Sequence, residues 1–269
     1  MAMQTRTLKE YMANPSGNKS SVLTNRQMYE DLYQGKWGEI MTRENGHVEY
    51  KLYHTKNEYV AYMKIPSEVV PEFYYDVVFK MVLKDSSSRT LENAIIQFFS
   101  NDPAFNFTWA YAFNKHGLCI KELEKKMSRT ALRLPPKEKN PDKTVGYVKS
   151  LYFGYIYLKS KGLLNKLRFE TEAEKLDWKL LNKLIRNTDD VVKEREDAGT
   201  KLAASKKKAK DVDRTNLRKE DIKHPEIHST ATQAIRRVNF IGNMNTVKKA
   251  GTVHKNGGIK RTKKIGGRR

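Results

Sequence analysis

Alternating apolar and polar positions predict strands in the first half of the chain. Residues 48–54 alternate in this way, Thr55-Lys56-Asn57 reads as a turn, and residues 58–65 run back, which together predict a β-hairpin. Residues 74–83 are rich in β-branched and aromatic side chains and predict a third strand. Residues 91–99 resemble a helix by their caps and a strand by their second half, so both alternatives stay open.

The densest aromatic stretch in the chain follows these strands. Large rings occupy every second position in it, at Phe105, Phe107, Trp109, Tyr111 and Phe113. A period of two predicts a strand with one aromatic face, which would complete a sheet of about four strands. The rings then belong either to a core or subunit-interface strand or to a base-stacking platform for nucleic acid. No Lys or Arg lies between residues 98 and 114, which favours the packing role.

Helical spacing of apolar residues predicts several helices around this sheet. Thr7 and Glu10 fit a capping box for a helix over residues 8–13. A second helix is expected from about residue 25 to residue 33, ending near Gly35. Further helices are expected over residues 118–127, over residues 143–161 with rings at Tyr152 and Tyr157, and after Thr171. The predicted fold class is therefore α+β, with a small antiparallel sheet of about four strands packed on several helices and an extended basic C-terminal tail.

Changes in composition divide the chain into four regions. Residues 1–42 form an N-terminal arm with short helices, and residues 43–186 form the α+β core. Residues 187–226 are expected to be a charged helical extension, and residues 227–269 a basic tail without acidic residues.

The charge balance points to a polyanionic partner. The 269 residues contain 52 Lys and Arg against 31 Asp and Glu, a net charge of +21. Such an excess predicts attraction to nucleic acid first and to an anionic membrane surface second. Cys119 is the single cysteine, so it forms no internal disulfide and is expected to be a small buried hydrophobe in a reducing compartment. No apolar run approaches the roughly 20 residues that cross a bilayer, so we expect a soluble protein without a membrane partner.

The tail carries the strongest functional signal. Beyond Glu226 the chain has eleven cationic residues, no acidic ones and six glycines. It is interpreted either as a solvated disordered tail or, preferably, as an arm that binds polyanions independently of sequence. The candidate phosphate-binding residues are Lys206, Lys207, Lys208, Lys210, Arg236, Arg237, Lys248, Lys249, Lys260, Arg261, Lys263, Lys264, Arg268 and Arg269. Phe240 lies in a short apolar group that would dock this tail on a neighbouring chain.

Catalytic and metal-binding patterns are weak throughout the sequence. His224 and His228 are four residues apart, but Pro225 interrupts the helix that would bring them together. No dinucleotide fingerprint, P-loop, HExxH or GxSxG is present. We therefore expect no catalytic residues, no metal, no cofactor and no small-molecule substrate. A nuclease would need a carboxylate cluster, for which Glu39, Glu44, Glu49 and Asp76 are the candidates.

Three passages resemble stretches of virion structural proteins of tailed bacteriophages. They are YMANPSGNKSS at residues 11–21, KIPSEVVPEFYY at residues 64–75, and residues 99–117 followed by GYVKSLYFGYIYLKSKGLL at residues 146–164. The resemblance covers about half of the chain and implies a subunit of a particle, in the capsid interior or the head–tail connector. The basic tail lies outside it.

These observations lead to two functional hypotheses. The first is a non-enzymatic structural protein of a phage virion, in the head, neck or connector, which forms multimers with copies of itself or other virion subunits. Its basic arm would contact nucleic acid, most simply DNA, or neighbouring subunits, and it would be assembled in the host cytoplasm. The alternative is a cellular nucleic-acid-binding protein, associated with the ribosome or nucleoid, that acts as a monomer or dimer.

Overall fold

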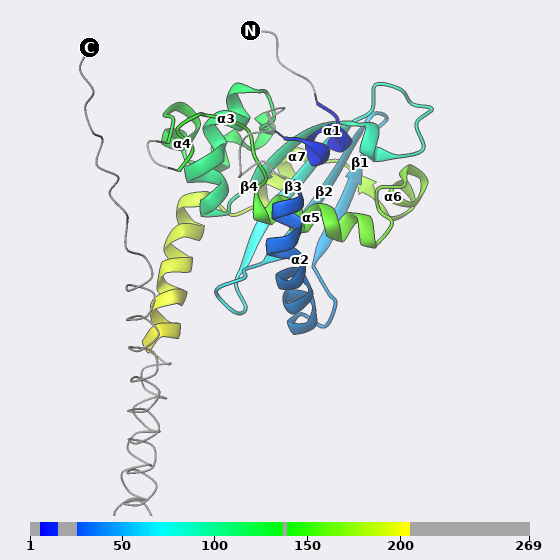
Figure 1. The fold of residues 1–269 in the computed structure, drawn as a ribbon. Helices are drawn as coiled ribbons and strands as arrows, with labels where there is room; N and C mark the ends of the chain where they lie inside the picture. The colour runs from blue at the N-terminus through cyan, green and yellow to red at the C-terminus, as the bar shows by residue number, and fades with distance from the viewer. Residues whose placement is uncertain (1–5, 16–25, 137–138, 205–269) are drawn as a thin grey trace, which may run out of the picture. The chain divides into compact units, whose positions relative to one another are not determined.

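The fold was determined as a computed structural model that describes residues 6–15, 26–136 and 139–204. The chain divides into two units, Met1–Leu202 and Ala203–Arg269, and the architecture below is that of the first unit. Figure 1 shows this unit as a twisted sheet surrounded by helices, which confirms the predicted α+β class.

The sheet has five strands in the order β4-β3-β2-β1-β5. The strands β1 (Tyr50–His54), β2 (Glu58–Pro66), β3 (Tyr74–Val82) and β4 (Ile95–Ser100) form an antiparallel meander. The predicted hairpin and third strand are confirmed. The two-residue β5 (Glu174–Lys175) adds a parallel edge beside β1, so the sheet is mixed.

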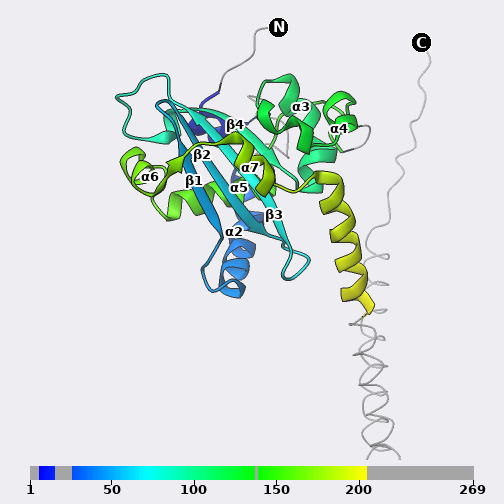
Figure 2. The ribbon, with the colours of Figure 1, turned by 180° about the vertical axis from the view of Figure 1, so that it is seen from behind.

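Helices cover both faces of this sheet. Figures 1 and 2 show α5 (Lys149–Ser160) in front of one face and α7 (Trp178–Leu184) in front of the other. On the first face a Cβ added at Gly154 would lie 3.0 Å from the Met63 Cε, so glycine lets α5 approach the sheet closely. Because both faces are covered, β2 and β3 are buried almost continuously instead of alternating between core and solvent.

The N-terminal and peripheral helices pack around this core. The capping box predicted for α1 (Leu8–Ala13) is confirmed, because the Glu10 amide donates to Thr7 Oγ1 while the Thr7 amide donates to the Glu10 carboxylate. The remaining elements are α2 (Arg26–Arg43), α4 (Arg129–Arg133), α6 (Lys166–Glu172), the 3-10 helices η2 (Leu91–Asn93) and η4 (Lys121–Lys126), and a helix over residues 188–204.

Several predicted helix bounds were wrong. The second helix, α2, continues through Gly35 to Arg43, where Asn45 and Gly46 adopt left-handed backbone angles that end it. The helix expected to begin at residue 143 begins at Lys149 instead, and the one expected over residues 118–127 is the 3-10 helix η4. Turn geometry near the helix ends decided these bounds, and apolar spacing alone carries no information about it.

The aromatic stretch is helical, so the predicted strand over residues 105–113 is wrong. Phe105–Trp109 form a π-helical turn, η3, and Ala110–Lys115 form the helix α3. The fourth meander strand is β4, which lies before this stretch. Three of the five rings, Phe105, Trp109 and Phe113, are spaced four residues apart. Residues at this spacing lie on the same side of a helix, and these three are buried in the core. Phe107 is 49% exposed and Tyr111 half-buried, as expected for the other side of a helix.

The Trp109 side chain packs against the backbone of Gly146. A Cβ added at residue 146 would lie 2.4 Å from the Trp109 ring, and the Gly146 carbonyl also accepts a hydrogen bond from the Tyr11 hydroxyl at 2.8 Å. Gly146→Ala is expected to destabilise the protein by about 1–3 kcal/mol, because the buried indole must move. Chemical denaturation will measure this change. Gly35→Ala is the control, since a Cβ there meets nothing within 4 Å; an equal effect of both substitutions would contradict the prediction.

Candidate functional site

The candidate phosphate-binding residues predicted from the tail lie outside the described residues. This holds for all fourteen candidate Lys and Arg residues between Lys206 and Arg269, for Phe240, and for His224 and His228. Their assignment stays a prediction from sequence.

The predicted interface rings divide into two groups in the structure. Phe105, Trp109 and Phe113 are buried inside this chain, and the rings of Phe105 and Phe113 meet edge to face at 5.1 Å. The rings at Tyr152 and Tyr157 of α5 are buried as well. These five side chains pack the chain's own core, so the interface prediction is wrong for Phe105, Trp109 and Phe113. Phe107 is the exposed ring and remains accessible to a partner.

A buried carboxylate on β3 organises the most extensive polar network in the described part of the chain. Asp76 is 1% exposed. Its Oδ2 accepts hydrogen bonds from Asn101 Nδ2 at 2.7 Å and from the Arg186 backbone amide at 3.0 Å. The Arg186 Nε lies 3.2 Å from the same oxygen, and the Tyr62 hydroxyl donates to Oδ1 at 3.0 Å. Donors from β2, from the end of β4 and from the segment after α7 therefore compensate one buried charge.

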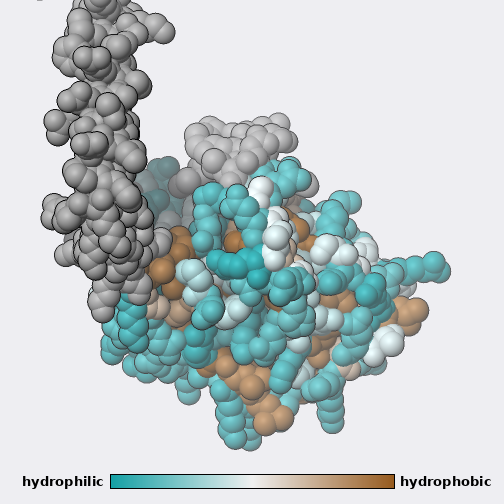
Figure 3. Space-filling view, turned by 90° about the horizontal axis from the view of Figure 1, so that it is seen from below, coloured by the Kyte–Doolittle hydropathy of each residue, from teal (hydrophilic) through white to brown (hydrophobic). Residues whose placement is uncertain are grey.

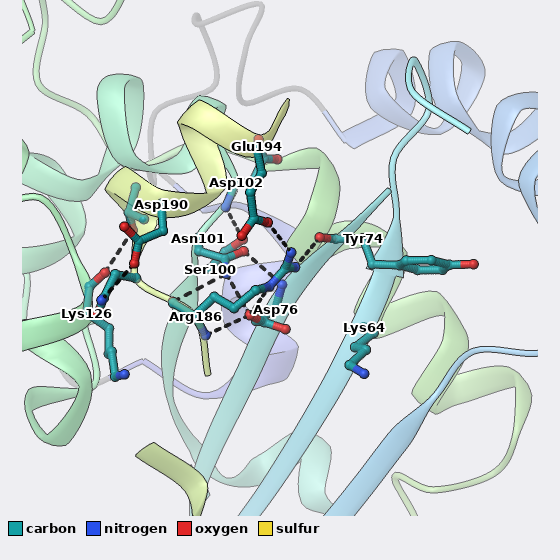
Figure 4. Close-up of polar contacts among 12 residues, drawn as sticks. Lys64, Tyr74, Asp76, Ser100, Asn101, Asp102, Lys126, Arg186, Asp190 and Glu194 are labelled. Atoms are coloured by element: carbon teal, nitrogen blue, oxygen red, sulfur yellow. Dashed lines mark hydrogen bonds and ion pairs between the residues drawn. The ribbon is translucent and has the colours of Figure 1, made fainter. Parts of the chain in front are cut away.

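Arg186 connects this carboxylate to the helix over residues 188–204. Figure 4 shows its guanidinium between Asp76, the Tyr74 carbonyl and Glu194, with Nη1 3.0 Å from Glu194 Oε2. The same helix buries Val191 against Phe73 and Tyr75. Sequence reasoning considered Asp76 only as a member of a possible nuclease carboxylate cluster and did not find Arg186, because no spacing rule relates residues 110 positions apart.

A cavity of about 230 Å³ lies at the start of α5. Its polar lining comes from the loop after β2 (Ser67 and Glu68), from Asp102 after β4, from Lys139, from Lys149 and Ser150 at the start of α5, and from Arg195 on the helix over residues 188–204. Its apolar lining includes Ile65, Val69, Phe107 and Phe153. The exposed Phe107 and Val69 thus belong to the wall of a cavity with charged groups inside it.

Charged groups in the cavity partly neutralise each other. Glu68 Oε2 lies 2.5 Å from Lys149 Nζ, and Oε1 of the same carboxylate pairs with Lys36. Although burial acts to raise the pKa of Glu68, hydrogen bonds and charge from Lys149 and Lys36 outweigh it and lower this pKa. Arg195 has a buried Nε without a hydrogen-bond partner among the described residues. The guanidinium lies near Tyr75 and Asp102 and influences the pKa of both.

Asp102 is the other acidic group of the cavity. Its side chain is buried, and its Oδ1 accepts a hydrogen bond from the Ala104 amide at 2.9 Å. Burial raises the pKa of Asp102, although the Ala104 hydrogen bond and the positive charges of Lys149 and Arg195 act in the opposite direction. The carboxyl group therefore retains its proton to higher pH in the folded protein than in the unfolded chain.

The other candidate chemical groups have structural roles in the described part of the chain. Cys119 is a free, buried thiol, as predicted, and burial raises its pKa. Of the carboxylates considered for a nuclease, Glu44 accepts from the Tyr74 hydroxyl and Glu49 pairs with Lys64. Within residues 6–15, 26–136 and 139–204, no three His, Cys, Asp or Glu side chains are placed to hold a metal ion. No helix in these ranges is long and apolar enough to span a membrane.

Comparison with family models, with curated protein sequences and with solved structures finds no match to this chain.

Removal of the charge on Asp76 is expected to cost about 2–4 kcal/mol of unfolding free energy, because Tyr62, Asn101 and the Arg186 Nε then lack a charged acceptor and Arg186 keeps only its pair with Glu194. The variant is Asp76→Asn, which keeps the size of the side chain, and urea denaturation measures the loss. Glu172→Gln is the control, since it breaks an exposed ion pair with Arg168 and should cost less than about 1 kcal/mol. A similar cost for both variants would show that the buried network does not stabilise the fold.

The raised pKa of Asp102 predicts a defined pH dependence. Deprotonation of this buried carboxyl group opposes folding. The contribution of Asp102 to stability is therefore fully present below the pKa that Asp102 has in the unfolded chain, and is lost as pH rises through its pKa in the folded protein. Asp102→Asn keeps the acceptor for the Ala104 amide. As pH rises from 4 to 7, this variant should therefore become more stable relative to the wild-type protein. Urea denaturation at several pH values measures this difference.

Asp85→Asn provides the control. Hydrogen bonds from Ser87 lower the pKa of Asp85, so its contribution is present above the pKa of the unfolded chain and is lost only as pH falls through the lower folded pKa. Between pH 4 and pH 7 the stability of this variant relative to wild type should therefore not rise. If Asp102→Asn behaves in the same way, the pKa of Asp102 is not raised in the folded protein.

Proposed function

We propose that the protein is a non-enzymatic structural protein of a phage virion, in the head, neck or connector, that assembles into multimers. Its C-terminal arm contacts nucleic acid, independently of sequence, or neighbouring subunits. The observation that carries this proposal is the segregation of charge along the chain. Residues 205–269 contain 19 Lys and Arg against five Asp and Glu, so +14 of the net +21 lies in this segment.

The pairing of charges differs between the folded unit and the arm. In the folded unit, several cations lie beside carboxylates from distant segments: Lys80, for example, lies 3.1 Å from Glu58 and 2.7 Å from Glu122. Beyond Glu226 the arm has no acidic residue that could play this part. We propose that its cations contact phosphates, and each such contact releases a condensed counterion from the nucleic acid.

Multimer formation is supported by the resemblance to virion proteins and by apolar side chains on the surface. Figure 3 shows a mainly hydrophilic surface with separate apolar patches on the face it presents. The large apolar side chains exposed in the described ranges are Val69, Phe107, Leu134, Leu167, Leu180 and Leu184. Such side chains are candidates for burial against a neighbouring subunit.

The salt dependence of DNA binding tests the role of the arm. Duplex DNA is titrated with the intact chain and with a variant in which the eleven cations beyond Glu226 are replaced by glutamine. The slope of log affinity against log salt should be steep for the intact chain. It should fall by about 0.9 for each phosphate contact removed.

A matched control variant replaces an equal number of exposed lysines of the folded unit, among them Lys51, Lys56 and Lys175. It should keep most of the slope. Equal slopes for the intact chain and the arm variant would contradict binding through the arm. Light scattering after size exclusion then separates the two hypotheses: a virion subunit forms rings or larger assemblies, whereas a cellular nucleic-acid-binding factor stays monomeric or dimeric.

A further inference from the structure

The cavity at the start of α5 has, besides the exposed Lys139, two positive groups that no paired carboxylate fully neutralises. Lys149 shares the Glu68 carboxylate with Lys36, and so has half of one counterion. Arg195 contributes a guanidinium whose Nε is buried without a hydrogen-bond partner among the described residues. Buried donors of native proteins nearly always have an acceptor, so a buried guanidinium nitrogen without one at a cavity suggests that a further group completes the arrangement.

The lining also restricts the charge of that group. Two carboxyl groups, Glu68 and Asp102, lie in the same cavity as Lys149 and Arg195. A dianion such as phosphate would be repelled by these carboxyl groups. A singly charged carboxylate suits the site better, because it needs less compensation and fits the planar fork of a guanidinium.

The remaining wall is apolar and the space is small. Phe107 and Phe153 supply rings to it, and the volume of about 230 Å³ is below the usual range for drug-sized ligands. A group that fills it has one anionic end and a compact apolar body of about the size of a single aromatic or branched side chain.

We propose that this cavity is a binding site for a small carboxylate with an apolar body, whose anionic end is held by Arg195 and Lys149 and whose body lies against Phe107 and Phe153. The ligand is bound and not converted. This inference goes beyond the proposed function, because it requires neither the basic arm nor assembly. A free metabolite and an acidic side chain presented by another subunit share this chemistry.

The probe for the test is 3-phenylpropionate, titrated calorimetrically into the full-length protein. We expect saturable binding with a dissociation constant of about 1 mM, in keeping with a ligand of this size. The neutral analogue 3-phenylpropionamide lacks the charge, and inorganic phosphate lacks the apolar body. Each should bind at least tenfold more weakly. Equal affinity for the amide or for phosphate would overturn the assignment of the ligand class.

Two variants locate the binding in the cavity. Arg195→Gln removes the guanidinium and should weaken binding at least tenfold. Ala104→Leu fills the cavity from an exposed lining position, without a buried charge being lost, and should abolish binding; its control is Ala13→Leu, at an exposed position on α1 outside the cavity. Unchanged affinity in both cavity variants would overturn the proposal.

The basic arm keeps its charges in all these variants. Non-specific binding of the probe to the arm would therefore be unchanged in Arg195→Gln and Ala104→Leu. Binding that persists in both variants would thus be assigned to the arm and not to the cavity. The two sources of the carboxylate are separated by light scattering on the same variants. Loss of a multimer in Arg195→Gln and Ala104→Leu identifies a side chain of another copy as the ligand, and an unchanged multimer identifies a free small molecule.

Discussion

The compensation of one buried charge determines how the second half of the chain is arranged on the sheet. Asp76 faces the side of the sheet that α7 covers, where a carboxylate without donors would cost several kcal/mol. Tyr62 and Asn101 come from neighbouring strands, but Arg186 follows α7 by two residues. The path of the chain out of α7 is therefore restricted to the one that brings Arg186 to Asp76. That path starts the helix over residues 188–204 at the position where it contributes Val191 to the core and Arg195 to the cavity.

The same electrostatic requirement is met differently along the chain. Inside the folded unit, cations are placed beside carboxylates from distant segments, as Lys80 is between Glu58 and Glu122 and over the ring of Trp178. Lys149 and Arg195 are exceptions, since their charge is only partly neutralised, and both line the cavity. The residues beyond Glu226 have no acidic neighbours in sequence. Charge that is balanced stabilises the fold, and charge that is left unbalanced is where a partner or ligand of opposite sign is expected.

The aromatic stretch shows why a correct observation about sequence can lead to the wrong element. Five rings at every second position satisfy a strand pattern, but Phe105, Trp109 and Phe113 also satisfy a helical one. The local pattern fits a strand and a helix equally well. The fold decides between them, because β4 already occupies the edge position beside β3 and the three rings pack into the core from a helix. Gly146 illustrates the same point: its role depends on Trp109, which is 37 positions away in sequence.

The sequence by itself determined what depends on neighbouring residues and on composition. The hairpin and the third strand follow from period-two patterns and a turn at residues 55–57, the first helix from the capping box at Thr7 and Glu10, and the excess of positive charge from a simple count. Only the tertiary structure decided the helical state of residues 105–113, the partners of Asp76 and the cavity between Asp102, Lys149 and Arg195. The physical reason is range: caps, turns and alternation act over a few residues, whereas compensation of a buried charge and packing of a ring join residues that only the fold brings together.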